Sequence, residues 1–255
     1  MLTQQSTSLT EPWRGLKPHI SLTDIPTISF SQEEIDTIDE FCEKFFPRDM
    51  IDKGRYLYPQ ARGRKVNPNA RGIRGELAVL RYFAPHLSDL TSFLTDRPWK
   101  VRDMGDAIII GRKAKIFDTK TRARKVMPKT IIGDDSYMAE LDSKFTDRER
   151  YGYIQCFIFC ASNIPKNEVY IMGWMGREDF EEYAELYKAG REVPHAGIPY
   201  SSDFLCIPYR RLRPITQLIG LDYYPITNEM TYSMRSDYET RKRINGKKYV
   251  KDFEI

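Results

Sequence analysis

The sequence predicts an α/β fold in which a central mixed sheet is covered by helices on both faces. Three patterns in the chain point to this class. Apolar residues recur with helical spacing in two early segments, 31–46 and 68–84. A strand–turn–strand pattern follows at 101–120, and two apolar strands are expected at 151–161 and 168–174, with a helix directly after them.

The length and composition predict one large domain with appendages. The chain has 255 residues, of which 41% are hydrophobic, and this is enough for a sizeable core. Residues 1–30 are rich in Ser, Thr and Pro, so we expect an N-terminal arm there. Residues 31–230 form the expected domain, and residues 231–255 form a basic C-terminal tail.

The first two helices are predicted from their start signals and apolar spacing. Ser31 and Glu34 form a capping box, and the helix that they begin is expected to stop at Pro47. The second helix starts near Pro68 and ends near Pro85. It carries Glu76 in its middle.

The later elements follow an apolar and polar alternation along the chain. Residues 121–150 are charged and poorly periodic, which predicts a long excursion between strands. After the two apolar strands, a helix is expected at 177–188, with Gly190 as an end signal. A short strand is expected at 204–207 and a last helix at 210–219, which Pro214 interrupts.

The hairpin near 105–120 is the most informative feature of the sequence. Asp106 precedes its first strand, and Asp118 and Lys120 lie in its second strand. Because side chains alternate between the faces of a strand, Asp118 and Lys120 project from the same face. A turn near Arg112 places Asp106 across from Asp118 or Thr119. Two carboxylates and an ammonium then share one corner of the sheet.

This corner has the chemistry of a metal site. Two adjacent carboxylates repel each other unless a cation lies between them, and oxygen ligands suit Mg²⁺ or Mn²⁺. Metal ions supply the activated water and the charge neutralisation that phosphodiester hydrolysis needs. The expected ligands are the carboxylates of Asp106 and Asp118, that of Glu76 from the preceding helix, and the backbone carbonyl of Thr119. Lys120 is expected to point at the attacking water or at a phosphate oxygen.

The order of these residues resembles the PD-(D/E)xK nuclease superfamily, which includes restriction endonucleases, RecB-like exonucleases and Holliday-junction resolvases. The resemblance covers roughly residues 70–160 and rests on Gly75-Glu76, Asp106, Asp118-x-Lys120 and Gln155. The strand at 168–174 and the helix behind it resemble a pattern of phage and prokaryotic members. Three positions depart from the common pattern, because Gly105 stands in place of Pro, Asp118 in place of Glu, and Phe159 in place of the Tyr of RecB-like members.

The resemblance implies a restriction-endonuclease-like fold and a Mg²⁺-dependent enzyme that cleaves DNA, with Mn²⁺ as a substitute. It implies catalytic roles for Glu76, Asp106, Asp118 and Lys120. Gln155 is expected to hydrogen-bond the core or to orient a ligand. The expected assembly is a homodimer, which presents two sites to two DNA strands.

Basic side chains before and after this corner are the expected phosphate contacts. One group precedes the helix that carries Glu76, and the other follows Lys120 along the chain. The members are Arg62, Arg64, Lys65, Arg71, Arg74, Arg122, Arg124 and Lys125. Since charged loops usually face water, these residues could also be simple surface groups.

Several alternatives stay open at this stage. The same site would serve a junction resolvase or an exonuclease, and a protein of the same fold could bind nucleic acid without cleaving it. The motif could also be accidental in a different α/β enzyme. Asp103 is an alternative to Asp106 as the family acid, and Glu76 could be an exposed helix residue.

Other classes are disfavoured by the composition. Cys42, Cys156, Cys160 and Cys206 show no CxxC pair, and the histidines are far apart, which argues against zinc. Cys156 and Cys160 fall within an aromatic, strand-like run and are predicted to be buried thiols. No apolar run approaches the length of a membrane span, and the N-terminus has no signal-like core. The sequence therefore predicts a reduced, intracellular protein without a membrane partner.

Overall fold

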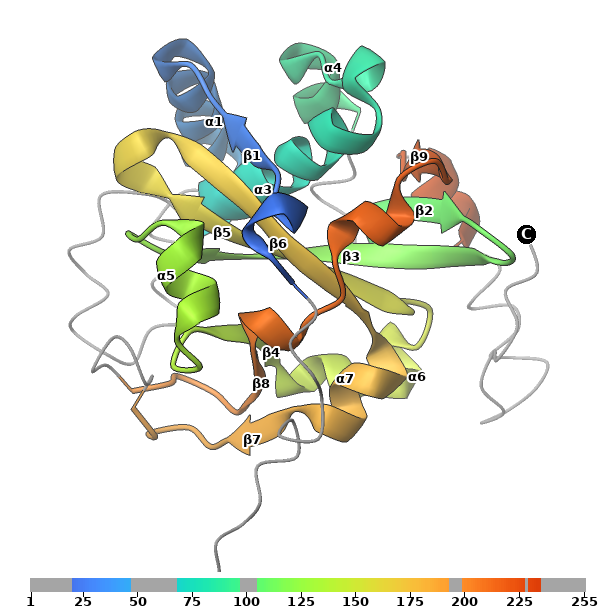
Figure 1. The fold of residues 1–255 in the computed structure, drawn as a ribbon. Coiled ribbons are helices and arrows are strands. Elements are labelled where there is room, and N and C mark those ends of the chain that lie inside the picture. The colour runs from blue at the N-terminus through green and yellow to red at the C-terminus, as the bar shows by residue number, and fades with distance from the viewer. Residues whose placement is uncertain (1–19, 47–67, 97–104, 193–198, 228, 235–255) are drawn as a thin grey trace, which may run out of the picture.

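A computed structural model describes residues 20–46, 68–96, 105–192, 199–227 and 229–234. Within these residues the chain forms a six-stranded mixed sheet, with the order β1-β6-β5-β3-β2-β9, and a three-stranded antiparallel sheet, with the order β4-β8-β7 (Figure 1). The predicted α/β class, a mixed sheet flanked by helices, is confirmed.

The strands and helices have the following bounds. The large sheet contains β1 (Thr27–Ser29), β2 (Ala107–Ile110), β3 (Ala114–Ala123), β5 (Cys156–Asn163), β6 (Glu168–Gly176) and β9 (Asp222–Pro225). The small sheet contains β4 (Met138–Asp142), β7 (Glu185–Tyr187) and β8 (Phe204–Pro208). The helices are α1 (Gln32–Phe45), α3 (Pro68–Phe83), α4 (Leu90–Thr95), α5 (Pro128–Gly133), α6 (Arg148–Tyr151) and α7 (Arg177–Tyr183). The 3₁₀ turns include η5 (Ser143–Thr146), η7 (Tyr209–Arg211) and η8 (Ile215–Leu218).

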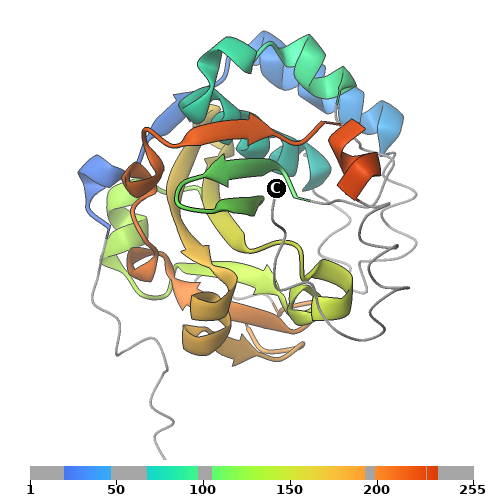
Figure 2. The same cartoon turned by 90° about the vertical axis from the view of Figure 1, so that its right-hand side faces the viewer.

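The large sheet separates two apolar layers. On one face, α1 and α3 bury residues such as Ile38 and Leu77 against Phe117 and Ile158. On the other face, the small sheet, α5 and α7 pack against Ile116 and other residues of the sheet. Figure 2 shows α1 and α3 on one side of the curled sheet and the small sheet on the other. Residues that alternate along β3 therefore enter different layers.

The predicted helices α1 and α3 are confirmed. The Ser31 backbone N–H donates to Glu34 Oε2 at 2.9 Å, and the Glu34 N–H donates to Ser31 Oγ at 3.2 Å, which completes the capping box. Helix α3 approaches β3 so closely that a Cβ on Gly75 would collide with the hydroxyl of Thr121. This contact explains why glycine precedes Glu76.

Four sequence predictions differ from the structure in the middle and late parts of the chain. Residues 121–150 contain α5, α6 and the strand β4, which carries a buried Glu140. The strand predicted at 151–161 begins only at Cys156, and the helix predicted at 177–188 ends at Tyr183, where the chain turns into β7. The last predicted helix, at 210–219, is two separate 3₁₀ turns on either side of Pro214, which cannot donate a helical hydrogen bond.

Both ends of the described chain join the fold. We expected residues 20–30 within the arm, but β1 pairs with β6 and Ile25 and Phe30 are buried. Short strands with few apolar residues give a weak sequence signal, and β9, which pairs with β2, escaped prediction for the same reason. At the start of the predicted tail, Thr231 and Met234 are buried. Residues 235–255 lie outside the described residues.

Two further expectations concern thiols and membranes. The four cysteines are free and buried, which confirms the prediction made for Cys156 and Cys160. Burial raises the pKa of Cys42, Cys156 and Cys206 to about 12. In the part of the chain that the structure describes, no helix has both the length and the apolar character needed to span a bilayer.

Candidate functional site

The site lies at the start of β2, beside the part of β3 that continues past it. Ala107 of β2 is opposite Phe117, and β3 then runs on to Ala123. Asp106 occupies this corner, because its N–H donates to the Phe117 carbonyl at 2.8 Å and its own carbonyl accepts from the Ile226 N–H at 3.0 Å. Its Oδ2 accepts from the Thr119 N–H at 2.5 Å. The buried Asp106 carboxylate therefore caps the edge of β3 just before β2 starts.

Gly105 makes this corner possible. Its φ of +96° lies in the left-handed region, and a Cβ there would lie 2.6 Å from Ile116 Cγ2 and 3.0 Å from the Phe117 carbonyl oxygen. Proline at this position would be locked near −65° and could not adopt this backbone. The glycine at position 105 thus has a direct conformational cause.

Asp118 and Lys120 project from the same face of β3, as predicted. Asp118 is 1% exposed, and Lys120 Nζ lies 2.5 Å from its Oδ2. The ammonium also lies 3.9 Å from the centroid of the Phe145 ring. An acid, an ammonium and an aromatic ring therefore form one compact group on the side of the small sheet.

The register brings Asp106 next to this group. Ala107 pairs with Phe117, so the next position places Asp106 beside Asp118. Its hydrogen bond reaches Thr119, which is one of the two positions that the sequence prediction gave. The N–H and C=O of a strand residue point to the same edge, and the Thr119 carbonyl therefore lies along the edge that Asp106 caps. Burial raises the pKa of the Cys160 thiol, and the Asp106 carboxylate raises it further.

Glu76 lies on α3, the helix that packs on β3, and its charge acts on the Cys42 thiol of α1. Gly75 rests on Thr121 of β3, and the ring of Phe83 stacks on Tyr223 of β9 at 5.2 Å. Glu76 and Phe83 are seven residues apart and lie on the same side of the helix, so Glu76 is on the side that faces from β3 toward β2 and β9. The side chain is half-buried.

The carboxylates do not form a ready three-ligand centre. Among the described residues, no group of three or more His, Cys, Asp or Glu side chains is arranged to hold a metal ion. What the corner does present is the pair Asp106 and Asp118 together with the Thr119 carbonyl. These are hard oxygen donors, the chemistry that Mg²⁺ and Mn²⁺ prefer.

Gln155 supports the corner from the far side of β3. It lies just before β5 rather than within a strand. Its Oε1 accepts from the Ile116 N–H at 3.1 Å, and its own N–H donates to the Ile116 carbonyl at 3.0 Å. These bonds fix β3 two residues before Asp118. Gln155 therefore hydrogen-bonds the core, in line with the prediction.

Some predicted phosphate contacts are interior groups instead. Arg74 is buried and bonds Asp39 at 2.7 Å, and Arg124 is buried and bonds Glu140 at 2.8 Å. Their guanidinium groups support the fold and are not available to a phosphate at the surface, which corrects the prediction for both. The sequence could not separate them from surface arginines, because their acidic partners are distant in sequence.

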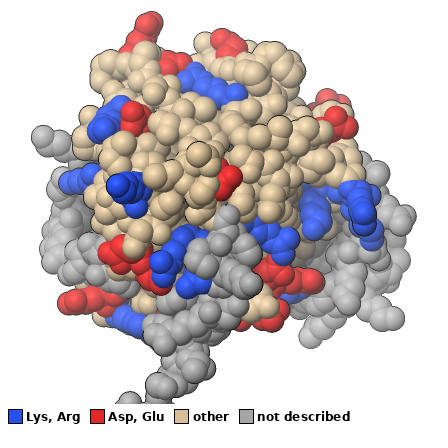
Figure 3. Space-filling model, viewed as in Figure 1, with Lys and Arg blue, Asp and Glu red and all other residues tan. Residues whose placement is uncertain are grey.

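The other basic residues differ in accessibility. The side chain of Arg122 is 32% exposed, Lys125 is exposed and Arg71 is half-buried. On the described part of the face in Figure 3, basic and acidic side chains are interspersed over uncharged surface. Arg62, Arg64 and Lys65 lie outside the described residues, and so does the alternative acid Asp103.

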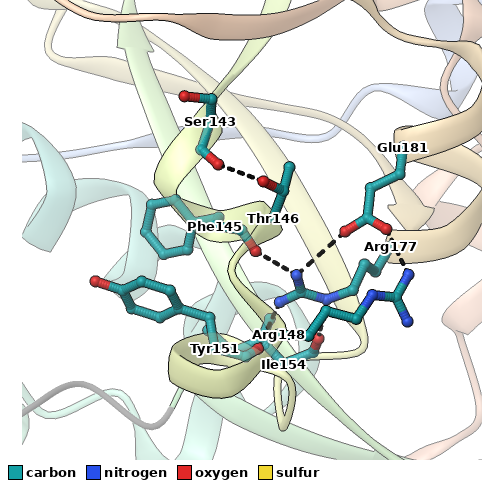
Figure 4. Close-up of polar contacts among 8 residues, drawn as sticks. All are labelled: Ser143, Phe145, Thr146, Arg148, Tyr151, Ile154, Arg177 and Glu181. Carbon is teal, nitrogen blue, oxygen red and sulfur yellow. Dashed lines mark hydrogen bonds and ion pairs between the residues drawn. The ribbon is translucent and has the colours of Figure 1, made fainter.

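Two residues near the corner were missed by sequence reasoning. Phe145 covers Lys120, and Arg177 binds the segment that carries Phe145 (Figure 4). The available signal was an arginine directly after the apolar strand β6, where a buried cation needs several acceptors. The geometry of the corner stands on its own, because no family model, curated protein or solved structure matches this chain.

Proposed function

We propose that the protein is a metal-dependent endonuclease that hydrolyses DNA phosphodiester bonds at the corner where β2 starts beside β3. The observation that carries the proposal is the juxtaposition of Asp106 with the Asp118–Lys120 pair, where β3 extends beyond its neighbour. The mixed sheet, with α3 against β3 and this acidic hairpin, supports a restriction-endonuclease-like fold. No other corner of the described residues combines the predicted acids with a lysine in this way.

The donor set supports a hard divalent cation. Asp106, Asp118 and the Thr119 carbonyl would hold Mg²⁺ or Mn²⁺, and Glu76 would approach from α3. When bound, such an ion supplies an activated water and neutralises charge on the phosphate. In the structure Lys120 neutralises Asp118 instead, so the proposal includes a shift of the ammonium away from this carboxylate.

The protein groups have separate tasks in this proposal. Asp106 is fixed by backbone hydrogen bonds and gives the corner its shape. Lys120 has a flexible stem and can move from Asp118 to an oxygen of the substrate, where it orients the phosphate. The exposed Lys125, which follows β3, would contact an adjacent phosphate. Cleavage of both strands requires two sites, so a homodimer is part of the proposal.

The test is cleavage of supercoiled plasmid with Mg²⁺ or Mn²⁺, beside a chelator control. We expect Asp118→Asn to reduce the rate on the order of 10²–10³-fold, as is typical for loss of one group that stabilises developing charge. Asp222→Asn and Lys115→Ala, which change an exposed acid and an exposed lysine of the same sheet, should retain the rate. Wild-type cleavage that continues in chelator, or an Asp118→Asn variant as active as wild type, would refute the metal mechanism.

Substrate comparison separates endonuclease action from related activities. An endonuclease opens closed circular DNA, an exonuclease acts only on ends, and a resolvase prefers a four-way junction. A native mass measurement tests the homodimer. These results decide between reactions that use the same corner.

A second candidate is a nucleic-acid-binding protein that does not cleave. It is favoured by the absence of a three-ligand group among the described residues and by the neutralised Asp118. Retained binding, with no cleavage of duplex, branched or single-stranded DNA by the wild type, would establish it.

A further inference from the structure

Arg177 joins three strand and helix ends next to the candidate site (Figure 4). It is 4% exposed. Its Nε donates to the Ile154 carbonyl at 2.7 Å, its Nη2 to the Tyr151 carbonyl at 2.5 Å, and its Nη1 to the Phe145 carbonyl. Nη1 also lies 3.3 Å from Glu181 Oε1. One guanidinium therefore binds the segment 143–155 at three separate points.

These acceptors belong to short elements that offer few backbone donors, although the Tyr151 carbonyl also accepts from the Ile154 N–H at 3.1 Å. Phe145 lies in η5, Tyr151 is the last residue of α6, and Ile154 precedes β5. Carbonyls at the end of a helix lack intrahelical partners, and a buried carbonyl without a partner is costly. The planar fork of arginine carries five N–H donors on three separated nitrogens and reaches acceptors that lie apart, whereas the three donors of a lysine ammonium sit on one atom.

The segment that Arg177 binds carries the ring over Lys120. Lys120 Nζ lies 3.9 Å from the Phe145 centroid, and that ring packs on Tyr151 at 4.7 Å and on Phe157 at 6.3 Å. Phe157 is the register partner of Asp118 in β5. The ring is therefore held between the segment and the strand beside Asp118.

A second contact ties the guanidinium to the same strand. The Arg177 guanidinium carbon lies 5.4 Å from the Phe157 centroid, and the Arg177 backbone N–H donates to the Gln155 carbonyl at 2.8 Å. Gln155 in turn fixes Ile116, two residues before Asp118. Arg177 thus connects the strand below Lys120 with the ring above it.

We propose that Arg177 is a positioning residue that keeps the Lys120 ammonium on Asp118 by holding the Phe145 ring over it. The consequence for turnover rests on the proposed nuclease function, but the positioning itself does not. Loss of the Phe145 ring removes one of the groups that hold the Lys120 ammonium in place, and loss of Arg177 releases the segment that carries the ring. Both changes let the lysine leave Asp118 more often.

The test measures access to the Lys120 amine by reductive methylation at one fixed pH. Chymotryptic cleavage after Phe117 separates Lys120 from the exposed Lys115, which serves as an internal reference in mass spectrometry. Loss of a cation–π contact should raise the Lys120 labelling rate about two- to thirty-fold in Phe145→Leu. Phe145→Tyr, which keeps the ring, should label like wild type.

The role of Arg177 is tested by a double-mutant cycle. Arg177→Lys should raise Lys120 labelling as Phe145→Leu does, and should add no further increase in the Phe145→Leu background. Arg148→Ala is the matched control, because Arg148 also binds Glu181 but is exposed, and its side chain lies outside the group of three carbonyls that Arg177 binds. It should leave Lys120 labelling unchanged.

Two results would overturn the proposal. One is a Phe145→Leu variant, folded by circular dichroism, with wild-type Lys120 labelling. The other is an Arg177→Lys increase of equal size with and without the Phe145 ring. If Arg177→Lys does not fold, the comparison of Phe145→Leu with Phe145→Tyr still decides whether the ring holds the lysine. Changed labelling in a protein that never cleaves DNA would refute the proposed function and leave the positioning intact.

Discussion

Two acid–base clusters lie on the same face of β3, a few residues apart, and they are built differently. In the first, Asp118 bonds Lys120, and the ammonium lies under Phe145. In the second, Glu140 of β4 bonds Arg122 at 3.0 Å and Arg124 at 2.8 Å. The rings of Phe204 and Tyr209 lie 4.8 Å and 5.7 Å from these two guanidinium groups. Each cluster thus places a buried carboxylate, its cations and aromatic rings between the two sheets.

The difference lies in the cations and their remaining hydrogen bonds. Both oxygens of Glu140 meet a guanidinium, and Arg124 also donates to the carbonyls of Ala123 and Met138 at 3.0 Å and 2.9 Å. Asp118 instead pairs with the amine of Lys120, which has a flexible stem. This pair lies beside Asp106, where β2 starts. An ion network with many fixed bonds fastens the small sheet to β3, whereas a lysine pair can exchange its partner. Glu140 therefore supports the fold, whereas the exchangeable pair of Asp118 suits the role that the proposed function gives it.

The largest expected effect is on stability at Glu140. Glu140→Ala leaves the buried Arg124 and the partly exposed Arg122 without their shared carboxylate, and should lower the free energy of unfolding by about 3–5 kcal/mol. Glu185→Ala is the matched control, because Glu185 and Glu140 are register partners of the same residue, Cys206, and Glu185 binds the exposed Arg191. That change should cost less than about 1 kcal/mol. Urea denaturation measures both, and equal losses would remove the distinction between the clusters.

The next effect is stabilisation by a metal ion at the other cluster. Mg²⁺ or Mn²⁺ that binds the folded protein should raise its free energy of unfolding by about 2.7 kcal/mol at a hundred times the dissociation constant. Asp118→Asn should lose this gain, whereas Asp222→Asn should keep it. Thermal melts with and without each ion provide the measurement. Equal stabilisation of Asp118→Asn would mean that the ion binds elsewhere.

The sequence predicted the geometry of the hairpin better than it predicted the elements around it. The hairpin, the shared face of Asp118 and Lys120, and the position of Asp106 follow from strand alternation and from a turn of known length, which are local rules. The capping box of α1 is local as well. These features need no knowledge of distant contacts.

The remaining features depend on contacts between distant residues. Arg74 and Arg124 have the same local signal as surface arginines, and only Asp39 and Glu140 show that they are interior. Strands β1 and β9 are short and form because β6 and β2 offer free edges. The contacts of Arg177 could not be predicted for the same reason, since its acceptors lie 23 to 32 residues away in sequence.

A smaller effect is expected on the stability of Asp118→Asn. The neutral amide removes a buried charge, and Lys120, whose side chain is 19% exposed, can turn its ammonium toward water. The free energy of unfolding should change by less than about 1 kcal/mol, in contrast to Glu140→Ala. Urea denaturation without added metal measures it. A loss as large as that of Glu140→Ala would show that Asp118 also supports the fold.

The smallest effect is expected at Glu34, which gives the baseline of an ion pair near the surface. Burial alone would raise the pKa of Glu34, but hydrogen bonds from Arg81 and Ser31 outweigh it and lower the pKa from the ordinary 4.5. A carboxyl whose folded pKa is lowered adds stability that is complete above its unfolded pKa, and this stability is lost as the pH falls through the folded pKa. Glu34→Gln can keep the capping box, so it removes mainly the charge. It should cost about 0.5–1 kcal/mol at neutral pH and almost nothing near pH 3.

Glu33→Gln is the control for this pH dependence. Glu33 lies in the same first turn of α1 and is exposed, so its substitution removes the same favourable charge from the helix N-terminus without breaking the pair with Arg81. Thermal midpoints across the acid range should therefore separate from wild type more for Glu34→Gln than for Glu33→Gln as the pH rises above 4.5. Parallel curves for the two variants would assign the effect to the helix dipole, and the Arg81 pair would then contribute nothing measurable.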